Sequence, residues 1–299
     1  MKSTLLRCVV ARVAIPAAAF LAALLLPLAP AFAQNTMVRM ETTEGIMDIK
    51  LLDTEAPGTV ANFLVYLREG SYTYGLVHRS AWVSQSVPFV VQAGGFRWPP
   101  GSGNVAVTTH DPIANEFSPT RSNVRGTVAM AKQANNPNSA TSQWFVNMSN
   151  NASNLDNQNG GFTVFARVTT PGMATADRIS ALPRQNLGSP FSELPVLDAN
   201  APAVRTNVVL INAAYELPNA NDSDRVFNYL EAAYPEILAP ARAIPLAVGS
   251  FHVRYYSTLN LYLGTNDTTL YYLLASGDGV LHSLGAVADW LAIAQGAGY

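Results

Sequence analysis

The sequence predicts a mainly β protein, either a barrel or a sandwich, followed by a small α+β module. From Tyr72 onward the apolar runs are short, and clusters of Gly, Pro, Asn and Ser separate them. Many short strands with only two helix-like stretches are typical of a barrel or a sandwich. A polar, turn-rich stretch at residues 217–224, LPNANDSD, predicts the boundary before the module.

The first elements that we expect are a β-hairpin and a helix. Residues 38–42 and 47–51 each alternate between the two faces of a strand, and the turn segment TTEG joins them. From Val60 apolar side chains recur at i, i+3, i+4 and i+7, the period of an amphipathic helix. Pro57 suits the first turn of this helix, and Gly70 is typical of its end.

The rest of the first part reads as strands with one more helix. We expect the helix at residues 174–182, before Pro183. The expected strands lie in PFVVQAGGF, GTVAMAK, SQWFVNM, GGFTVFARV and NVVLINAAYEL.

After residue 217 the pattern changes. One helix is expected before Pro235, then an aromatic-rich antiparallel sheet, then a helix near VADWLAIA. We therefore expect one domain at residues 34–216 and a small α+β module at residues 217–299. Five tyrosines of the module fit either a binding face or, as we favour, core and cross-strand packing: Tyr255, Tyr256, Tyr262, Tyr271 and Tyr272.

The N-terminus reads as a secretory signal peptide at residues 1–33. Basic residues precede an apolar run at residues 13–28, and the small residues of AFA, 31–33, offer a cleavage site before Gln34. A retained membrane anchor is the alternative, but three prolines in this stretch disfavour it. We expect a periplasmic or secreted protein that has no membrane contact after the signal peptide is removed.

Charge and composition exclude several classes of function. The chain has 18 Lys+Arg against 20 Asp+Glu and no long basic block, which disfavours nucleic acid as a partner. Cys8 is the single cysteine and lies in the expected signal peptide, so we expect no disulfide and no thiol chemistry. The four histidines, His78, His110, His252 and His282, stand far apart, so we expect no metal site and no cofactor.

Motifs of nucleophilic or nucleotide chemistry, such as G-x-S-x-G or G-x-x-x-x-G-K-[ST], are absent from the sequence. Five mainly apolar segments with a few polar residues stand out instead. They are HRS (78–80), FVVQAGGF (89–96), RGTVAMAK (125–132), SQWFVN (142–147) and NLDNQNGGFTVFARV (154–168). In this order they resemble the cyclophilin family of peptidyl-prolyl isomerases, most closely its secreted bacterial members, over residues 37–216.

The resemblance implies a closed eight-stranded antiparallel barrel, capped by two helices, with a substrate groove on its outer face. It also implies an enzyme, a peptidyl-prolyl cis-trans isomerase, whose partners are proline-containing unfolded or exported polypeptides. Arg79 matches the catalytic arginine of the family, and Gln92 matches the glutamine that holds it. The residues that match the substrate-binding positions are Phe89, Val90, Lys132, Gln143, Phe145, Leu155 and Phe162. Because strand side chains alternate, Trp144 is expected to point into the barrel when Phe145 faces the groove.

Two departures from the family pattern affect these expectations. Nine residues, SAWVSQSVP, separate Arg79 from Phe89 where the family has about four, and the extra length leaves open a loop that bulges over the groove and displaces Arg79. Asn154 stands where many members carry an aromatic residue, which implies weak cyclosporin binding. Two alternatives therefore stay open: a non-catalytic chaperone or pseudo-isomerase that binds proline peptides, and an adhesin or scaffold that acts through the module.

Overall fold

The structure is a computed structural model that describes residues 35–238, 246–249, 251–266, 268–277 and 279–299. The expected signal peptide lies outside the described residues. Residues Gln34–Tyr299 form one compact unit. In the described part of the chain, no helix has both the length and the apolar character needed to cross a membrane.

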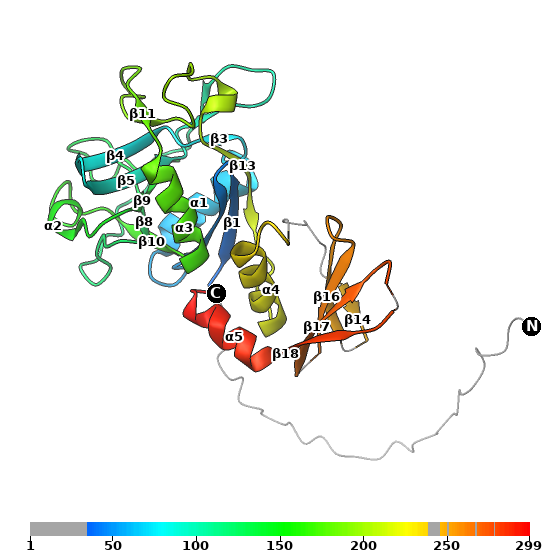
Figure 1. Cartoon of the computed structure of the whole chain (residues 1–299). Helices are drawn as coiled ribbons and strands as arrows, with labels where there is room; N and C mark the ends of the chain where they lie inside the picture. Colours follow the sequence, from blue (N-terminus) through cyan, green and yellow to red (C-terminus); the bar gives the residue numbers. More distant parts are fainter. Residues whose placement is uncertain (1–34, 239–245, 250, 267, 278) are drawn as a thin grey trace, which may run out of the picture. The chain divides into compact units, whose positions relative to one another are not determined.

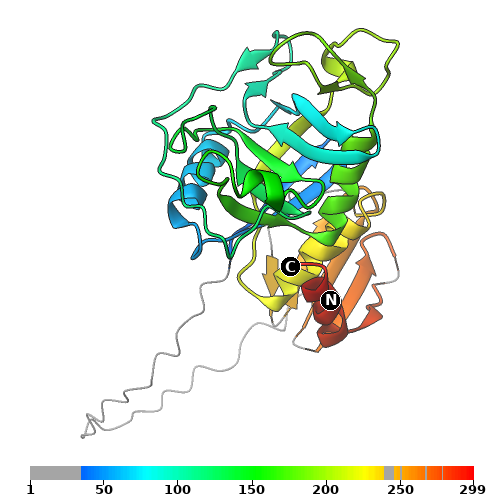
Figure 2. The ribbon, with the colours of Figure 1, turned by 90° about the vertical axis from the view of Figure 1, so that its left-hand side faces the viewer.

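The first part of this unit is built on one antiparallel sheet of eleven strands, in the order β4-β5-β9-β8-β10-β2-β1-β13-β3-β6-β7 (Figures 1 and 2). The strands are β1 (Met37–Thr42), β2 (Gly45–Leu51), β3 (Gly75–Leu76), β4 (Arg79–Ser84), β5 (Val87–Ala93), β6 (Phe96–Arg97), β7 (Val105–Ala106), β8 (Thr127–Met130), β9 (Trp144–Asn147), β10 (Val164–Val168) and β13 (Leu210–Glu216).

The closed eight-stranded barrel implied by the resemblance is not confirmed, because the sheet is open in its pairing order and has eleven strands. The reason lies between β3 and β4. The backbone N–H of Val77 still bonds to Val209 beside β13, at 3.0 Å, whereas that of His78 bonds to Gln92 of β5, at 3.2 Å. The chain thus changes partner within one residue. The sheet therefore curls so that residues 77 and 78 bond to two strands far apart in the sheet order, β13 and β5, but no continuous ladder of hydrogen bonds closes it.

Two long helices cover the sheet, α1 (Pro57–Arg68) and α3 (Thr170–Ala181). Pro57 starts α1, as predicted. Helix α3 begins four residues earlier than expected, because the Thr169 side chain caps it by accepting a hydrogen bond from the Gly172 N–H. The main core lies inside the curled sheet, where Phe63 of α1 packs against Tyr72 and Phe165 at ring-centroid distances of 5.0 and 5.1 Å.

Short elements complete this part of the fold. They are α2 (Ala152–Leu155), β11 (Arg184–Gln185), β12 (Leu194–Pro195) and a 3-10 turn at Arg205–Asn207. Leu194 and Val196, which flank the end of β12, are buried beside Leu76 of β3. This second apolar cluster fixes the backbone of β12 next to the start of β4.

Residues after 217 form a five-stranded antiparallel meander with a helix at each end (Figure 1). Its elements are α4 (Asp222–Ala233), β14 (Leu246–Val248), β15 (Phe251–Tyr256), β16 (Leu261–Thr265), β17 (Thr269–Leu274), β18 (His282–Ala286) and α5 (Val287–Gly296). The Asn221 side chain caps α4 by accepting a hydrogen bond from the Asp224 N–H at 2.9 Å.

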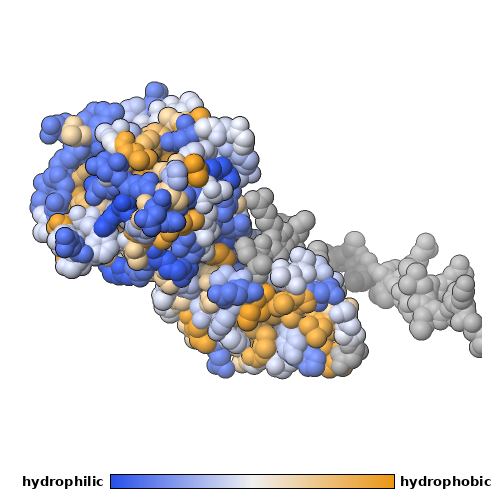
Figure 3. All heavy atoms as spheres, turned by 45° about the horizontal axis from the view of Figure 1, so that its top comes forward, coloured by the Kyte–Doolittle hydropathy of each residue, from blue (hydrophilic) through white to orange (hydrophobic). Residues whose placement is uncertain are grey.

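The tyrosines of this sheet divide between its two faces. Tyr256 is fully buried on the helix side, in the cluster that contains Phe227 of α4. Tyr255 and Tyr262 pack ring to ring across β15 and β16, with centroids 4.8 Å apart, and both are partly exposed. Tyr262 also belongs to an apolar hollow, and apolar residues gather on this module in Figure 3. Core packing accounts for Tyr256, and cross-strand packing pairs Tyr255 with Tyr262.

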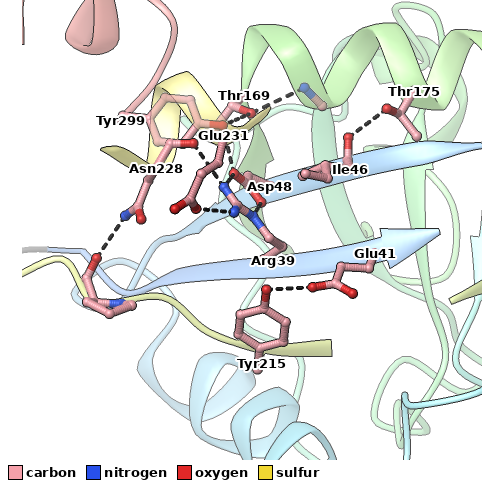
Figure 4. Close-up of polar contacts among 12 residues, drawn as sticks. Arg39, Glu41, Ile46, Asp48, Thr169, Thr175, Tyr215, Asn228, Glu231 and Tyr299 are labelled. Carbon is pink, nitrogen blue, oxygen red and sulfur yellow. Dashed lines mark hydrogen bonds and ion pairs between the residues drawn. The ribbon is translucent and has the colours of Figure 1, made fainter. Parts of the chain in front are cut away.

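A buried ionic cluster joins β1 and β2 to the C-terminal residues (Figure 4). Arg39 and Asp48 lie opposite each other in the register of β1 and β2. The Arg39 guanidinium, 1% exposed, donates to both carboxylate oxygens of Asp48 at 2.9 and 2.8 Å, and to Glu231 of α4 at 2.5 Å. The Tyr299 hydroxyl donates to Asp48 at 2.7 Å. Residues from both ends of the described chain therefore share one buried charge cluster.

Glu231 links this cluster to the module. Its second oxygen accepts hydrogen bonds from Arg254 and from the Tyr256 hydroxyl, both at 2.9 Å. Burial by itself raises the pKa of Glu231, but the charges of Arg39 and Arg254 outweigh it and hold the pKa below its ordinary value. The carboxylate therefore remains ionised between two guanidinium groups.

Candidate active site

The residues predicted to carry the chemistry form one row across the curled sheet. Arg79 on β4 pairs with Gln92 on β5, Gln92 pairs with Phe145 on β9, and Phe145 pairs with Ala129 on β8. Residues that are directly opposite in an antiparallel sheet project from the same face. The register thus brings an arginine, a glutamine and a phenylalanine together on the outer face.

The neighbouring row projects into the core. Trp144 pairs with Ala93 and Met130, and all three are buried in the main core. The Trp144 ring lies 6.5 Å from Phe63 and 6.3 Å from Tyr72, both edge-on. The predicted alternation of Trp144 and Phe145 is confirmed, and it explains why a polar-looking region of the sequence holds two large aromatic residues.

An apolar cluster separate from the main core lies on the outer face beside Arg79. Phe145 is 4% exposed, and its ring meets that of Phe162 edge-on at 5.8 Å. Phe89 and Phe162 are only partly buried, so they are the accessible part of the cluster. All five apolar residues predicted for the substrate site belong to this cluster: Phe89, Val90, Phe145, Leu155 and Phe162.

Lys132 supports Phe162. Its ammonium group donates to the carbonyls of Asn159 and Gly161, at 2.8 and 2.6 Å, and lies 4.7 Å from the Phe162 ring centroid. Burial lowers the Lys132 pKa to about 8. The side chain thus fastens the loop that carries Phe162.

Gln143 lies next to Gln92, whose side-chain amide donates to the Gln143 oxygen at 2.8 Å. Glycine at position 95 makes this placement possible, because a Cβ there would stand 2.8 Å from the Gln143 side chain. Gly94 has φ +83°, a conformation that favours glycine. The pair of glycines in AGGF therefore leaves room for Gln143 beside the row.

Sequence reasoning missed one charged neighbour of this row, Glu193. The Arg79 Nε donates to a Glu193 carboxylate oxygen at 2.8 Å, whereas the contact from Arg79 to Gln92 is 3.4 Å. Glu193 follows Arg79 by 114 residues and lies in a turn-rich segment. No local sequence motif identifies Glu193 as a site residue. Its position beside β4 depends on strand β12, which begins at the next residue.

The nine-residue segment between Arg79 and Phe89 does not form a loop that bulges over the groove. It continues β4 and β5 as a hairpin with register irregularities, which turns between Ser84 and Val87. Trp82 fastens the hairpin, because its indole N–H donates to the Ser180 carbonyl of α3 at 3.2 Å and Arg184 lies over its ring. The extra residues therefore extend the sheet and leave Arg79 in register with Gln92.

His78 precedes the arginine but has the environment of a structural residue. It is 3% exposed and packs edge-on against Phe96 at 5.1 Å. Burial is the main cause that lowers its pKa from 6.5 to about 4. His78 is therefore neutral at neutral pH and carries no charge into the site.

This pKa gives a prediction for stability. The folded-state pKa of His78 is about 4 and the ordinary value is 6.5, so between these values the unfolded chain binds a proton that the folded chain does not. Stability is then lost as pH falls through this window, by about 2 kcal/mol between pH 7 and pH 5. Urea unfolding at both pH values should show this loss in the wild type and a smaller loss in His78→Gln. The exposed His252 provides the control, His252→Gln, which should behave as the wild type. An undiminished loss in His78→Gln would contradict the assignment.

Comparisons with known proteins agree with this geometry. The family model described as cyclophilin type peptidyl-prolyl cis-trans isomerase/CLD matches residues 37–201, more than half of the chain. A peptidyl-prolyl cis-trans isomerase of Acinetobacter baylyi is 37% identical over 156 residues, 52% of this chain and 77% of that protein. Isomerase A of Dickeya dadantii is 37% identical over 171 residues, 56% of this chain and 83% of that protein. Isomerase B of Escherichia coli is 41% identical over 151 residues, 49% of this chain and 85% of that protein.

The matched region contains every residue of the row and of the apolar cluster, and Glu193 as well. The geometry and the comparisons thus lead to the same conclusion: the chain belongs to the cyclophilin family of peptidyl-prolyl cis-trans isomerases.

Proposed function

We propose that this isomerase accelerates rotation about X–Pro bonds by donating a hydrogen bond from Arg79 to the prolyl nitrogen. The observation that carries the proposal is the row in which Arg79 stands beside the apolar cluster of Phe145. The reaction makes and breaks no covalent bond, so it needs no nucleophile. Its barrier is amide resonance, about 18–20 kcal/mol, and X–Pro exchange without a catalyst takes tens to hundreds of seconds.

The chemistry of the twisted amide explains why an arginine suits this role. Rotation out of the plane localises the lone pair on the prolyl nitrogen, which then becomes a hydrogen-bond acceptor. A fixed donor therefore stabilises the twisted state more than either planar isomer. The Arg79 guanidinium stays charged and holds its N–H groups in a planar fork.

The apolar cluster supplies the other half of the mechanism. Phe89 and Phe162 are partly exposed over the buried Phe145, a surface that suits the ring of a proline. Contacts of this kind are the same in both isomers and in the twisted state, so they bind the peptide without changing the barrier. Gln92 and Gln143, hydrogen-bonded to each other, offer polar groups to the peptide backbone.

A non-catalytic proline-peptide binder is the main alternative. This alternative requires that the long segment at residues 80–88 displaces Arg79 from the site. The register of Arg79 with Gln92 and the anchoring of Trp82 support the catalytic proposal instead. An exchange experiment on a short Ala-Pro peptide separates the two functions. A catalyst speeds cis/trans interconversion at substoichiometric concentration, whereas a binder shifts peptide resonances without faster exchange.

The proposal includes an exported setting, with unfolded exported polypeptides as substrates. Its support is the basic and then apolar N-terminal sequence that ends in AFA at 31–33. Every site residue falls within residues 34–216, so the proposed module at residues 217–299 adds no group to the row. N-terminal sequencing of the protein from a bacterial periplasmic fraction should give a chain that begins at Gln34. A chain with an intact N-terminus in the membrane fraction would contradict removal of the signal peptide, and a chain found only in the cytoplasmic fraction would contradict the export proposal.

Weak cyclosporin binding is a further expected outcome. Asn154 is exposed on α2, and its side-chain oxygen is bonded to Gln158. It offers neither the flat apolar wall nor the indole N–H of a tryptophan. The two losses are worth on the order of 1–3 kcal/mol each, or roughly one to four decades of affinity if additive. Inhibition in the exchange assay should be weak and should strengthen in Asn154→Trp. Nanomolar inhibition of the unmodified protein would contradict this expectation.

A further inference from the structure

We propose that Glu193 is a positioning residue for isomerisation, which holds the Arg79 guanidinium in the orientation that the twisted amide requires. The inference rests on the proposed function of Arg79. It assigns to a carboxylate the task that the sequence pattern assigns to Gln92.

The contacts of Arg79 favour Glu193 as its main anchor. The bond from Arg79 Nε to Glu193 is 2.8 Å long and joins two opposite charges, whereas the Arg79 contact with the Gln92 oxygen is 3.4 Å long. Both bonds use the charged guanidinium, but only the bond to Glu193 joins it to a second, opposite charge, and the 3.4 Å contact is longer than a normal N–H···O bond. The Gln92 amide nitrogen donates to Gln143 at 2.8 Å, so its oxygen is the end of the amide that faces Arg79.

Glu193 bonds to the Nε edge of the guanidinium, which leaves the terminal N–H groups of Arg79 available for catalysis. A guanidinium has five N–H donors in a fixed planar fork, one on Nε and four on the two terminal nitrogens. Glu193 occupies the Nε donor, so four terminal donors remain for Gln92 and for a substrate. One fixed bond at Nε restricts rotation of the whole fork, because the group is planar and rigid.

Glu193 is itself held in place by its backbone. Its carbonyl accepts a hydrogen bond from the N–H of Ser80, the residue after Arg79, at 2.8 Å. The next residue, Leu194, is 2% exposed and packs in the cluster with Leu76. Backbone and side chain of Glu193 therefore both bond to the start of β4, which makes the carboxylate a fixed reference point for the arginine.

Loss of this carboxylate should affect turnover more than binding. The Arg79 side chain is 36% exposed, so without Glu193 it has only the long contact to Gln92 and water to orient it. A displacement of about 1 Å in a catalytic group lowers rates by up to about 100-fold. The apolar cluster grips the peptide independently of this orientation, so the dissociation constant should stay close to that of the wild type.

The test compares Glu193→Ala, Glu193→Gln and Asp177→Asn in the chain 34–299. Asp177 forms a comparable ion pair with Arg125, at 2.7 Å, and lies outside the row, so Asp177→Asn is the matched control. Exchange spectra of an Ala-Pro peptide give the turnover rate at saturation, and peptide titration gives Kd. The ¹⁵N resonance of Arg79 Nε–H, assigned by its loss in Arg79→Ala, reports on the bond to Glu193 directly.

We expect Glu193→Ala to lose about 10- to 100-fold in turnover, with Kd and melting temperature little changed and the Nε–H resonance shifted. Glu193→Gln should recover part of the turnover, because its amide oxygen still accepts from Nε. Full turnover in Glu193→Ala, alongside an inactive Arg79→Ala, would overturn the positioning role alone. Full turnover in Arg79→Ala would instead overturn the proposed function. Equal losses in Kd, turnover and melting temperature would make Glu193 a structural residue.

Discussion

Arg79→Ala is expected to lower turnover by about 10²- to 10³-fold, the cost of removing one fixed donor from a developing lone pair or charge. Kd for a proline peptide should change little, because the donor acts mainly on the twisted amide. Arg79 is partly exposed, so the truncation should leave the fold intact. Line-shape analysis of a titrated Ala-Pro peptide yields turnover and Kd from one data set.

Phe145→Ala is the comparison that separates a loss of catalysis from a loss of peptide binding. Phe145 is 4% exposed and lies under Phe162 in the apolar cluster. Its truncation removes apolar surface that contacts the peptide in both its planar and its twisted state. Peptide affinity and turnover should therefore weaken together. The assigned roles would be contradicted if Arg79→Ala and Phe145→Ala gave the same pattern of losses.

Arg39→Leu is expected to lower the free energy of unfolding by about 3–5 kcal/mol, the usual cost of removing one partner from a buried ion pair. The substitution leaves Asp48, which is 0% exposed, and Glu231, which is 2% exposed, without their shared cation. Two buried carboxylates then face each other across the space of the lost guanidinium. Urea unfolding at neutral pH measures the effect.

Arg68→Leu is the matched control for this substitution. Arg68 also pairs with a carboxylate through two hydrogen bonds, to Glu216 at 2.7 and 3.0 Å, but its side chain is 62% exposed. Exposed pairs contribute below about 1 kcal/mol. Comparable losses in Arg39→Leu and Arg68→Leu would contradict the view that the buried cluster holds the C-terminal residues to β1 and β2.

Local patterns predicted much of the active-site face. The alternation of SQWFVN was enough to direct Trp144 and Phe145 to opposite faces, because successive side chains of a regular strand alternate and β9 pairs regularly over these residues. The order of the motifs then selected Arg79 and Gln92, and the structure places them directly opposite each other. These expectations depended on neighbours in sequence or on a family pattern.

Long-range contacts account for what the sequence could not predict. Arg39 occupies a polar position in an alternating strand, which normally faces water, yet it is buried between Asp48 of β2 and Glu231 of α4, the latter 192 residues away. Glu193 reaches Arg79 across 114 residues in the same way. The extra residues after Arg79 read as a loop, yet they form a hairpin because α3 offers the Ser180 carbonyl to Trp82.

Exchange spectroscopy of an Ala-Pro peptide with catalytic amounts of the chain 34–299 and of its Arg79→Lys variant tests the central claim most directly. Lysine keeps the positive charge but lacks the planar fork that can bond Glu193 and the prolyl nitrogen together. We predict strong cis/trans exchange cross-peaks with the wild type and near-background exchange with Arg79→Lys, while both proteins bind the peptide. A wild type that binds without accelerating exchange, or an Arg79→Lys variant as fast as the wild type, would contradict catalysis by the Arg79 guanidinium.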